Sequence, residues 1–158
     1  MTTDVKEFAK QTIDELSESE VMELWEYLNS LHKKHETVDQ EVCGKFREAL
    51  DALLQECSAD NWDGYGAKAL QFGSYREALR FVQSLPTTIP VPELAADPDG
   101  AIAFEWDNGP RRIFSISVGD SGELIYAGIF GNSKTHGTEF FEDGIPKILL
   151  DHLQRLFL

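Results

Sequence analysis

The chain has 158 residues, of which 42% are hydrophobic and 11% aromatic, and this composition is typical of a folded domain rather than a disordered chain. Its formal net charge of −14 repels phosphate backbones and anionic lipids, so we expect no direct nucleic-acid contact and no membrane partner. The sequence has no apolar run of about 18 residues and lacks the basic, apolar start of a signal peptide, so we expect a cytoplasmic protein.

Acidic residues are concentrated in the first part of the chain. Residues 1–60 carry 15 acidic and 6 basic side chains, whereas residues 61–158 carry 13 and 8. Such a surface favours a basic partner or serves solubility. Cys43 and Cys57 lie on one expected helix, and 14 residues at about 1.5 Å each place them too far apart for a disulfide, so we expect both to be reduced.

Helical periodicity begins with a first helix, and a second helix follows it. The residues on one face of the first helix are Val5, Phe8, Ala9, Ile13 and Leu16. Ser17 and Glu20 have the spacing of a capping box, in which the serine hydroxyl accepts from the glutamate amide while the glutamate reaches back. Glu20, Glu23 and Glu26 fall on one side of the second helix, where a solvated face is the ordinary explanation. The opposite, apolar side of that helix comprises Val21, Leu24, Trp25, Leu28 and Leu31.

Residues 32–40 are polar and predict a connection, after which a third helix is expected over residues 41–57. The inward residues of this helix are Val42, Phe46, Leu50, Leu53, Leu54 and Cys57. His32 and His35 have a spacing that can chelate a metal, but the sequence offers no third ligand. We therefore expect surface histidines that interact with a helix C-terminus, and we expect no metal or cofactor.

A further helix is expected over residues 74–85, where Ser74 and Glu77 fit a second capping box. Its inward residues are Ala78, Phe81, Val82 and Leu85. Residues 86–100 cannot be helical, because their four prolines remove hydrogen-bond donors and fix backbone angles. Asp97–Gly100 predicts a tight turn rather than a calcium loop, since the other oxygen ligands of such a loop are missing.

The second half of the chain has the alternating pattern of strands. They are expected over residues 101–106, 111–118 and 123–130, with a fourth, edge strand within residues 131–141. Residues 123–130 are nearly all apolar, which predicts the central strand. Gly137 predicts a bulge in the edge strand.

A C-terminal helix is expected over residues 145–157, with Pro146 near its first position and His152 partly exposed. Its inner stripe is Ile148, Leu149, Leu153 and Leu156. The predicted fold class is α+β, with N-terminal helices, a three- to four-stranded antiparallel meander and a C-terminal helix. The helices at 74–85 and 145–157 are expected to cover the apolar face of the sheet. We divide the chain into an acidic N-terminal helical hairpin, residues 1–40, and an α+β domain, residues 41–158.

Polar residues in the sheet half have structural interpretations. Gly119–Gly122 copies the nucleophile tetrapeptide of trypsin-like serine proteases, but between two apolar strands it predicts a hairpin turn. Arg111 and Arg112 are expected to pair with Glu105 or Asp107 across a hairpin, and anion binding is the alternative.

The segment NWDGYGA, residues 61–67, has neither helical nor strand periodicity. Asp63 and Gly64 form a turn dipeptide, and Gly66 permits a second reversal of the backbone. We expect Trp62 and Tyr65 to pin this long connection onto the domain, while Asp63 accepts hydrogen bonds from nearby amides. The alternative is a recognition loop, because Trp and Tyr are favoured anchors at interfaces.

This segment also carries a resemblance. NWDGYGA, a helix ending in LP, a proline-rich stretch, DPDG, the strand IAFEW and the strand FSISV together resemble a group of uncharacterised bacterial proteins associated with mobile genetic elements and defence regions. The resemblance covers about residues 58–130 and implies no catalytic residue. The acidic N-terminal hairpin is similar to the two-helix segments of addiction-module components.

These features favour a non-enzymatic acidic protein-interaction module, an inhibitor of the antitoxin or immunity type. Its expected partner is a basic protein such as a toxin or a nuclease. The residues expected to bind this partner are Glu20, Glu23, Glu26, Trp62 and Tyr65.

Three alternatives remain open. One is a phage or plasmid protein that imitates nucleic-acid charge and inhibits a defence nuclease. Another is a small enzyme with a site over the sheet formed by Tyr126, His136 and Glu139. The last is a homodimer that associates through the N-terminal helices.

Overall fold

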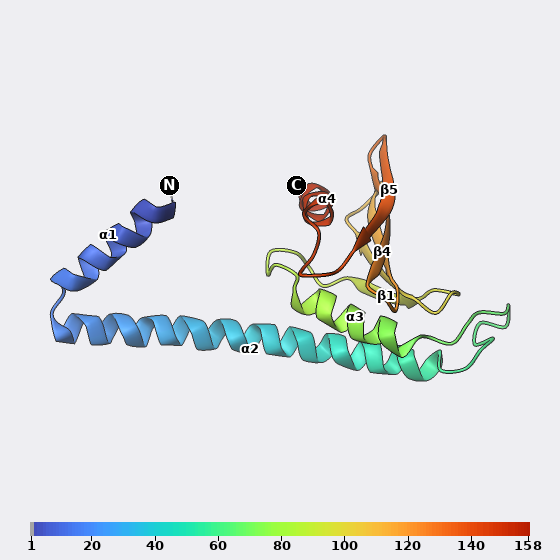
Figure 1. Cartoon of the computed structure of the whole chain (residues 1–158), viewed down its shortest axis with the longest axis horizontal. Coiled ribbons are helices and arrows are strands. Elements are labelled where there is room, and N and C mark those ends of the chain that lie inside the picture. Colours follow the sequence, from blue (N-terminus) through green and yellow to red (C-terminus); the bar gives the residue numbers. More distant parts are fainter. Residues whose placement is uncertain (1) are drawn as a thin grey trace. The chain divides into compact units, whose positions relative to one another are not determined.

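The computed structural model describes the backbone of residues 2–158 and the side chains of residues 7, 9–31 and 40–158. Within this part the chain forms four helices and five strands (Figure 1). Their bounds are α1 Thr2–Glu15, α2 Glu18–Glu56, α3 Phe72–Gln83, β1 Glu93–Ala96, β2 Ile102–Asp107, β3 Arg112–Val118, β4 Glu123–Phe130, β5 Ser133–Phe140 and α4 Lys147–Phe157. The chain divides into two compact units, the helical unit Met1–Glu41 and the sheet unit Val42–Leu158, and we describe each by itself.

The α+β class, the antiparallel meander and the C-terminal helix are confirmed, but the sheet has five strands rather than three or four. The additional strand is β1, which lies inside the proline-rich stretch. Pro92 immediately precedes it and Pro98 follows it, so neither proline interrupts its hydrogen bonds to β2. Proline is tolerated at the ends of an edge strand, and the sequence pattern therefore excluded a helix there without excluding a strand.

The strands are ordered β1-β2-β3-β4-β5, so β3 is central and the prediction that residues 123–130 form the central strand is wrong. β4 is buried on one face only. Leu124, Tyr126 and Phe130 are buried, whereas Ile125 on the other face is 50% exposed. Apolar composition alone therefore did not report how many faces of this strand are covered.

Gly137 does not form a bulge, because the register of β4 with β5 continues without an offset from Glu123 opposite Phe140 to Phe130 opposite Ser133. It lies opposite Tyr126, whose ring occupies the space above it. A Cβ atom at residue 137 would lie 2.6 Å from the Tyr126 hydroxyl oxygen and 2.8 Å from Cζ. The glycine is required by this close approach.

One face of the sheet carries the core, and three helices cover it. Phe46 of α2 and Phe81 of α3 both contact Phe104 of β2, with ring centroids 5.8 and 5.3 Å apart. Leu149 and Leu153 of α4 are fully buried in the same cluster. The predicted covering by α3 and α4 is confirmed, and the second half of α2 is a third cover. In α4 the predicted inner stripe is wrong at Ile148, which is 42% exposed.

The α2 helix is longer than the sequence pattern indicated. It continues through residues 32–40, so the polar connection predicted there is wrong. That segment contains no glycine or proline, and its lysines, glutamate and glutamine are good helix formers. The side chains of His32 and His35 lie outside the described residues. Cys43 and Cys57 are both free, as expected.

The first predicted capping box is confirmed. The Glu20 carboxylate accepts from the Ser17 backbone N–H at 2.9 Å and from its hydroxyl at 2.8 Å. The Glu20 backbone N–H in turn donates to the Ser17 hydroxyl oxygen at 3.4 Å. This reciprocal pair satisfies N–H groups at the start of α2 that have no partner within the helix.

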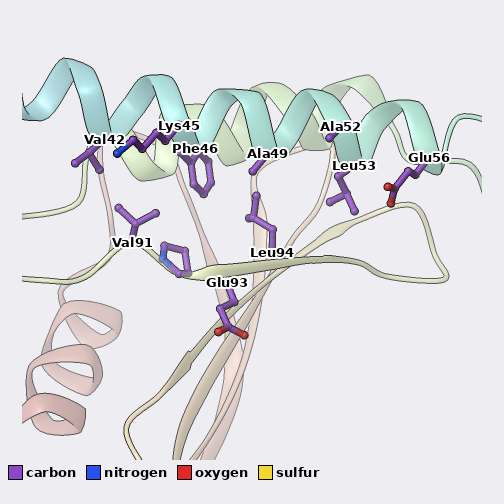
Figure 2. A pocket seen from close by; sticks show the side chains of 11 residues that line it. Val42, Lys45, Phe46, Ala49, Ala52, Leu53, Glu56, Val91, Glu93 and Leu94 are labelled. Atoms are coloured by element: carbon purple, nitrogen blue, oxygen red, sulfur yellow. The ribbon is translucent and has the colours of Figure 1, made fainter.

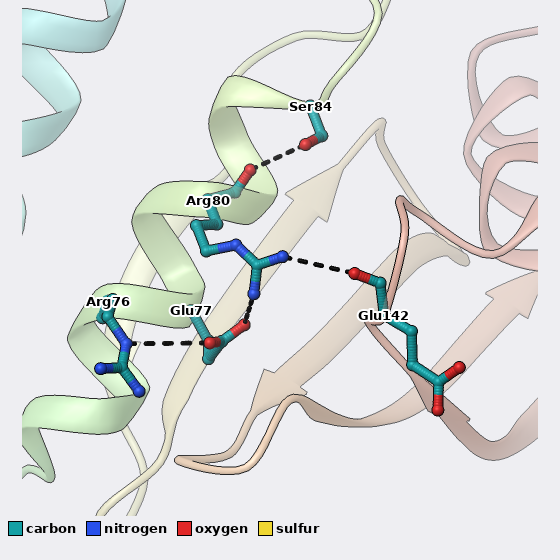
Figure 3. Close-up of polar contacts among 5 residues, drawn as sticks. All are labelled: Arg76, Glu77, Arg80, Ser84 and Glu142. Atoms are coloured by element: carbon teal, nitrogen blue, oxygen red, sulfur yellow. Dashed lines mark hydrogen bonds and ion pairs between the residues drawn. The ribbon is translucent and has the colours of Figure 1, made fainter.

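The second predicted capping box is wrong, because α3 begins at Phe72 and both Ser74 and Glu77 are buried inside it. Glu77 instead accepts from Arg80 Nη1 at 2.7 Å and lies 3.9 Å from Arg76 Nε (Figure 3). Arg80 also donates to the carbonyl oxygen of Glu142 at 3.3 Å. The buried carboxylate therefore holds an arginine that links α3 to the segment after β5.

The arginine pair after β2 does not bind Glu105 or Asp107, so that prediction is wrong. Arg112 donates from Nη2 to the carbonyl oxygens of Arg155 and Leu156 in the last turn of α4. These carbonyls have no partner within the helix, and a cation is favoured beside them. Arg111 donates from Nε to the Gly131 carbonyl oxygen at 2.8 Å.

The two predicted turns are confirmed. In Asp97–Gly100, the Asp97 N–H donates to Ala101 and the Gly100 N–H donates back to Asp97. In Gly119–Gly122, the Gly119 N–H donates to Glu123 and the Gly122 N–H donates back to Gly119. The last glycine of each turn has a positive φ, 92° at Gly100 and 83° at Gly122, which explains why glycine is present there.

Replacing Gly137 by alanine is expected to destabilise the protein by about 1–3 kcal/mol, because the new methyl group collides with the Tyr126 ring. Urea denaturation measures the change. The control is Gly44→Ala in α2, where the new Cβ has open space around it apart from the backbone of its own helix and its chain neighbours. That change should stabilise the protein by about 0.5–1 kcal/mol. Equal stability of wild type and Gly137→Ala would contradict the packing described for Tyr126.

Candidate functional site: two surfaces that lack cover

The helical unit exposes large apolar side chains. None of its described side chains, residues 7, 9–31, 40 and 41, is buried. Six apolar residues are between 43% and 62% exposed: Ile13, Met22, Trp25, Tyr27, Leu28 and Leu31. A single exposed apolar residue is ordinary, but five of these six lie within ten residues of α2, and a group of this size is typical of a contact surface.

Acidic residues accompany these apolar side chains, and their roles differ. Glu20 belongs to the helix cap, and its pKa is lowered first by the Ser17 backbone N–H and then by the Ser17 hydroxyl. Glu23 and Glu26 are exposed, and neither makes a comparable contact with another side chain that the structure describes. Glu26 lines a hollow of about 380 Å³ with Trp25 and Asn29. An aromatic ring and a carboxylate are therefore presented together.

The NWDGYGA segment is held by its own hydrogen bonds. Trp62 donates from Nε1 to the Lys68 carbonyl oxygen at 2.9 Å, and its ring packs against the core. Asp63 Oδ1 accepts from the N–H groups of Tyr65 at 2.8 Å and Ala67 at 3.1 Å, and these bonds lower the pKa of Asp63. The predicted pinning roles of Trp62 and Asp63 are confirmed. That of Tyr65 is wrong, because its side chain is 94% exposed.

Sequence reasoning missed two further residues of this segment. Asn61 accepts at Oδ1 from the Gly66 N–H at 2.7 Å, and Asp60 accepts at Oδ1 from the Ala69 N–H at 2.9 Å. Asn61 has a φ of 64°, a conformation that asparagine tolerates better than most residues. The one sequence signal for this role of Asn61 was its position as the first residue of the NWDGYGA segment.

The three residues of the alternative enzyme site are separated by the strand register. Tyr126 lies opposite Gly137 and Leu124 lies opposite Glu139, which places Tyr126 and Glu139 on the core face. His136 lies opposite Ala127, on the other face. Directly opposed residues share a face of the sheet, so His136 cannot converge with the other two.

His152 of α4 lies half-buried among aromatic rings, in agreement with the partial exposure expected. Its ring centroid is 5.6 Å from those of Phe114 and Tyr126 and 5.8 Å from that of Phe130. Burial lowers the pKa of His152, and Arg155 lowers it further, whereas Asp151 opposes them. A neutral imidazole packed on rings is a structural feature of the core.

The sheet unit has a groove between α2 and the segment that leads into β1. It has a volume of about 820 Å³ and is lined mainly by apolar side chains. Val42, Phe46 and Leu53 contribute from α2, and Val91 and Leu94 contribute from the other wall (Figure 2). Sequence reasoning missed this groove because its walls are about forty residues apart along the chain and no local pattern joins them.

Within the described residues, no three metal-ligating side chains gather in one place. None of the described helices combines the length and the apolar character needed to cross a lipid bilayer. Comparisons with protein-family models, curated proteins and solved structures find no match to this chain. Two surfaces therefore remain as candidate sites on their chemistry alone: the exposed apolar and acidic surface of the helical unit, and the groove between α2 and the segment that leads into β1.

Trp62→Phe is expected to lower the stability of the sheet unit by about 0.5–1.5 kcal/mol, because the hydrogen bond to Lys68 is lost. Tyr65→Ala is the matched control in the same loop. It should leave the melting temperature unchanged, since the Tyr65 side chain is almost fully exposed and buries little area on folding. Thermal denaturation of both variants checks this. A larger loss for Tyr65→Ala than for Trp62→Phe would contradict the roles described for the two rings.

The lowered pKa of His152 predicts that the protein becomes less stable on mild acidification. Its folded pKa is lower than that of the unfolded chain, so the unfolded chain binds more protons once the pH falls below the ordinary value of about 6.5. The stability due to neutral His152 is present above that pH and is lost as the pH falls through the folded pKa.

His152→Phe should therefore show a smaller fall in melting temperature between about pH 7.5 and 5.5 than the wild type. The control is Gln154→Phe, at an exposed position of the same helix, which removes no titrating group and should keep the wild-type slope. If His152→Phe kept the full slope, the pH dependence would have to come from other groups.

Proposed function

We propose that this chain is a non-enzymatic protein-interaction module that inhibits a basic protein, as antitoxins and immunity proteins do. Its partner is bound through the acidic, apolar surface of the helical unit. The observation that carries this proposal is the set of exposed side chains around Trp25, Leu28 and Leu31, accompanied by Glu23 and Glu26. In water such a surface favours association, because it removes apolar area from solvent.

The charge of the chain supports the choice of partner. The formal net charge is −14, and the region that includes the helical unit is the more acidic part. Complementary charge raises the rate of encounter with a basic protein, while buried aromatic anchors such as Trp25 determine how long the complex lasts. Glu23 and Glu26 are the better candidates for this steering role, since the Glu20 carboxylate is engaged in the helix cap.

Tyr65 is a second candidate contact. It is 94% exposed at the tip of a loop whose shape is held by Trp62 and Asp63. A rigid loop that presents an aromatic ring loses little conformational entropy on binding. Trp62 remains in the proposal as the residue that positions this loop.

The test uses the full chain as bait in an extract of the native host, followed by identification of the captured protein and binding kinetics with the purified pair. Glu23→Lys together with Glu26→Lys should lower the association rate roughly tenfold at low salt and less at high salt. Trp25→Ala should mainly raise the dissociation rate.

The matched control reverses two exposed acids of the sheet unit, Glu48→Lys with Asp143→Lys, which changes the net charge by the same amount. This control should slow association much less. A captured protein that is acidic, or one whose association rate is affected equally by both double variants, would contradict the proposal, and so would the absence of any captured protein.

A further inference from the structure

The first observation is that β1 is an edge strand with unpaired backbone groups. It pairs with β2 on one side only. The Asp97 N–H donates to Ala101, and hydrogen-bonded pairs alternate along an antiparallel ladder. Ala95 and Glu93 therefore direct their backbone groups toward β2, whereas Leu94 and Ala96 direct their N–H and C=O groups to the open edge. Such an edge is a template for another strand.

The second observation is that the apolar groove lies along this edge. Leu94 and Ala96 are half-buried on the core face of β1, and Val91 and Leu94 point toward α2 while Glu93 points away from it (Figure 2). Across the groove, α2 presents Ala49 and Leu53. The volume of about 820 Å³ is in the range that binds ligands. The groove thus extends the core beyond β1, in the place where the inward side chains of one more strand would lie.

The third observation concerns charge on the opposite face of β1. Glu93 lies directly opposite Glu105 of β2, and both are exposed. Glu105 accepts from the Ser115 hydroxyl at 3.4 Å, and no cation pairs with either carboxylate among residues 40–158. Like charges directly opposite each other on two strands are destabilising. A basic side chain on a strand added beside β1 would reduce this repulsion.

We propose that the groove binds an extended segment of a protein partner, which adds to the sheet as a sixth strand beside β1. The segment has apolar residues at alternate positions, which enter the groove beneath α2, and lysine or arginine between them, which lie beside Glu93. Backbone hydrogen bonds to Leu94 and Ala96 supply affinity, and the alternation supplies specificity. This surface is separate from the one proposed for the helical unit, so either proposal can fail without the other.

A second copy of this chain is a poorer occupant. Pairing of two β1 strands would bring the Glu93 side chains of both copies to the same small sheet edge, in addition to the two Glu105 carboxylates. The formal net charge of −14 on each copy opposes such an approach further. A basic segment meets neither obstacle.

The experiment measures binding of fluorescent peptides of about eight residues, a common strand length. The probe alternates valine and lysine. Three comparison peptides alternate valine with glutamate, hold the valines and lysines in separate blocks, or carry N-methyl groups on the backbone amides that would donate to β1. The alternating basic peptide should bind roughly tenfold more tightly than each of the others.

The variant Ala49→Trp, which fills the groove, should weaken this peptide roughly tenfold. Gln55→Trp, on the same helix but outside the groove, is the control and should bind as the wild type does. Far-ultraviolet circular dichroism and thermal melting establish that both variants fold. If Ala49→Trp lost its fold, Glu93→Lys replaces it as the test and should weaken the basic peptide while strengthening the acidic one.

Three results would overturn the proposal. Equal binding of the alternating peptide and of the peptide with valines and lysines in separate blocks would show that binding is only unspecific charge attraction. Equal binding of the N-methylated peptide would exclude strand addition. Self-association of the wild type that is abolished by Ala49→Trp, without binding of the basic peptide, would assign the groove to a second copy of the chain.

Discussion

The structure depends on the covering of a single apolar face of an antiparallel sheet. Phe104, Phe114, Ile116 and Leu124 are completely buried there, and three helices supply the opposing side chains. Because side chains alternate along each strand, this one-sided burial fixes which residues of all five strands face inward. The other face is only partly buried and carries the exposed residues Glu93, Glu105 and Ile125.

Polar groups in the sheet unit mostly hold connections to this core. Arg112 neutralises the carbonyl end of α4, Arg80 links α3 to the segment after β5, and Trp62 fastens a loop by one hydrogen bond. Each of these residues could be mistaken in the sequence for part of a binding or catalytic site. In three dimensions their donors meet backbone carbonyl oxygens, which explains their presence through the cost of leaving such groups without a partner.

What remains uncovered in the two units differs in its physical character. The helical unit presents exposed apolar and acidic side chains, and the recognition proposed there depends on buried apolar area and on charge. The groove beside β1 combines an apolar lining with the open edge of a strand, and the recognition proposed there depends on an extended, alternating segment. The two surfaces therefore differ in the chemistry proposed for them, and in both proposals the partner carries positive charge.

Local features of the fold, such as caps and turns, could be predicted from the sequence. Patterns only a few residues long predicted four features: the Ser17–Glu20 cap, the turns ending in Gly100 and Gly122, the amide contacts of Asp63, and the meander of β2 to β5. Of the proposed binding residues, Glu20 was thus placed in a helix cap by its sequence spacing, whereas the exposure of Tyr65 was decided by the contacts of the folded chain.

Tertiary structure decided the remainder. The position of β3 at the centre and the groove beside β1 involve segments that are distant along the chain. The need for glycine at Gly137 arises from the strand register, which places the Tyr126 ring over it. Periodicity reports which side of an element is apolar, but it does not report what will cover that side. Pairing between distant strands and the fit of one ring over one backbone arise only when the whole core closes.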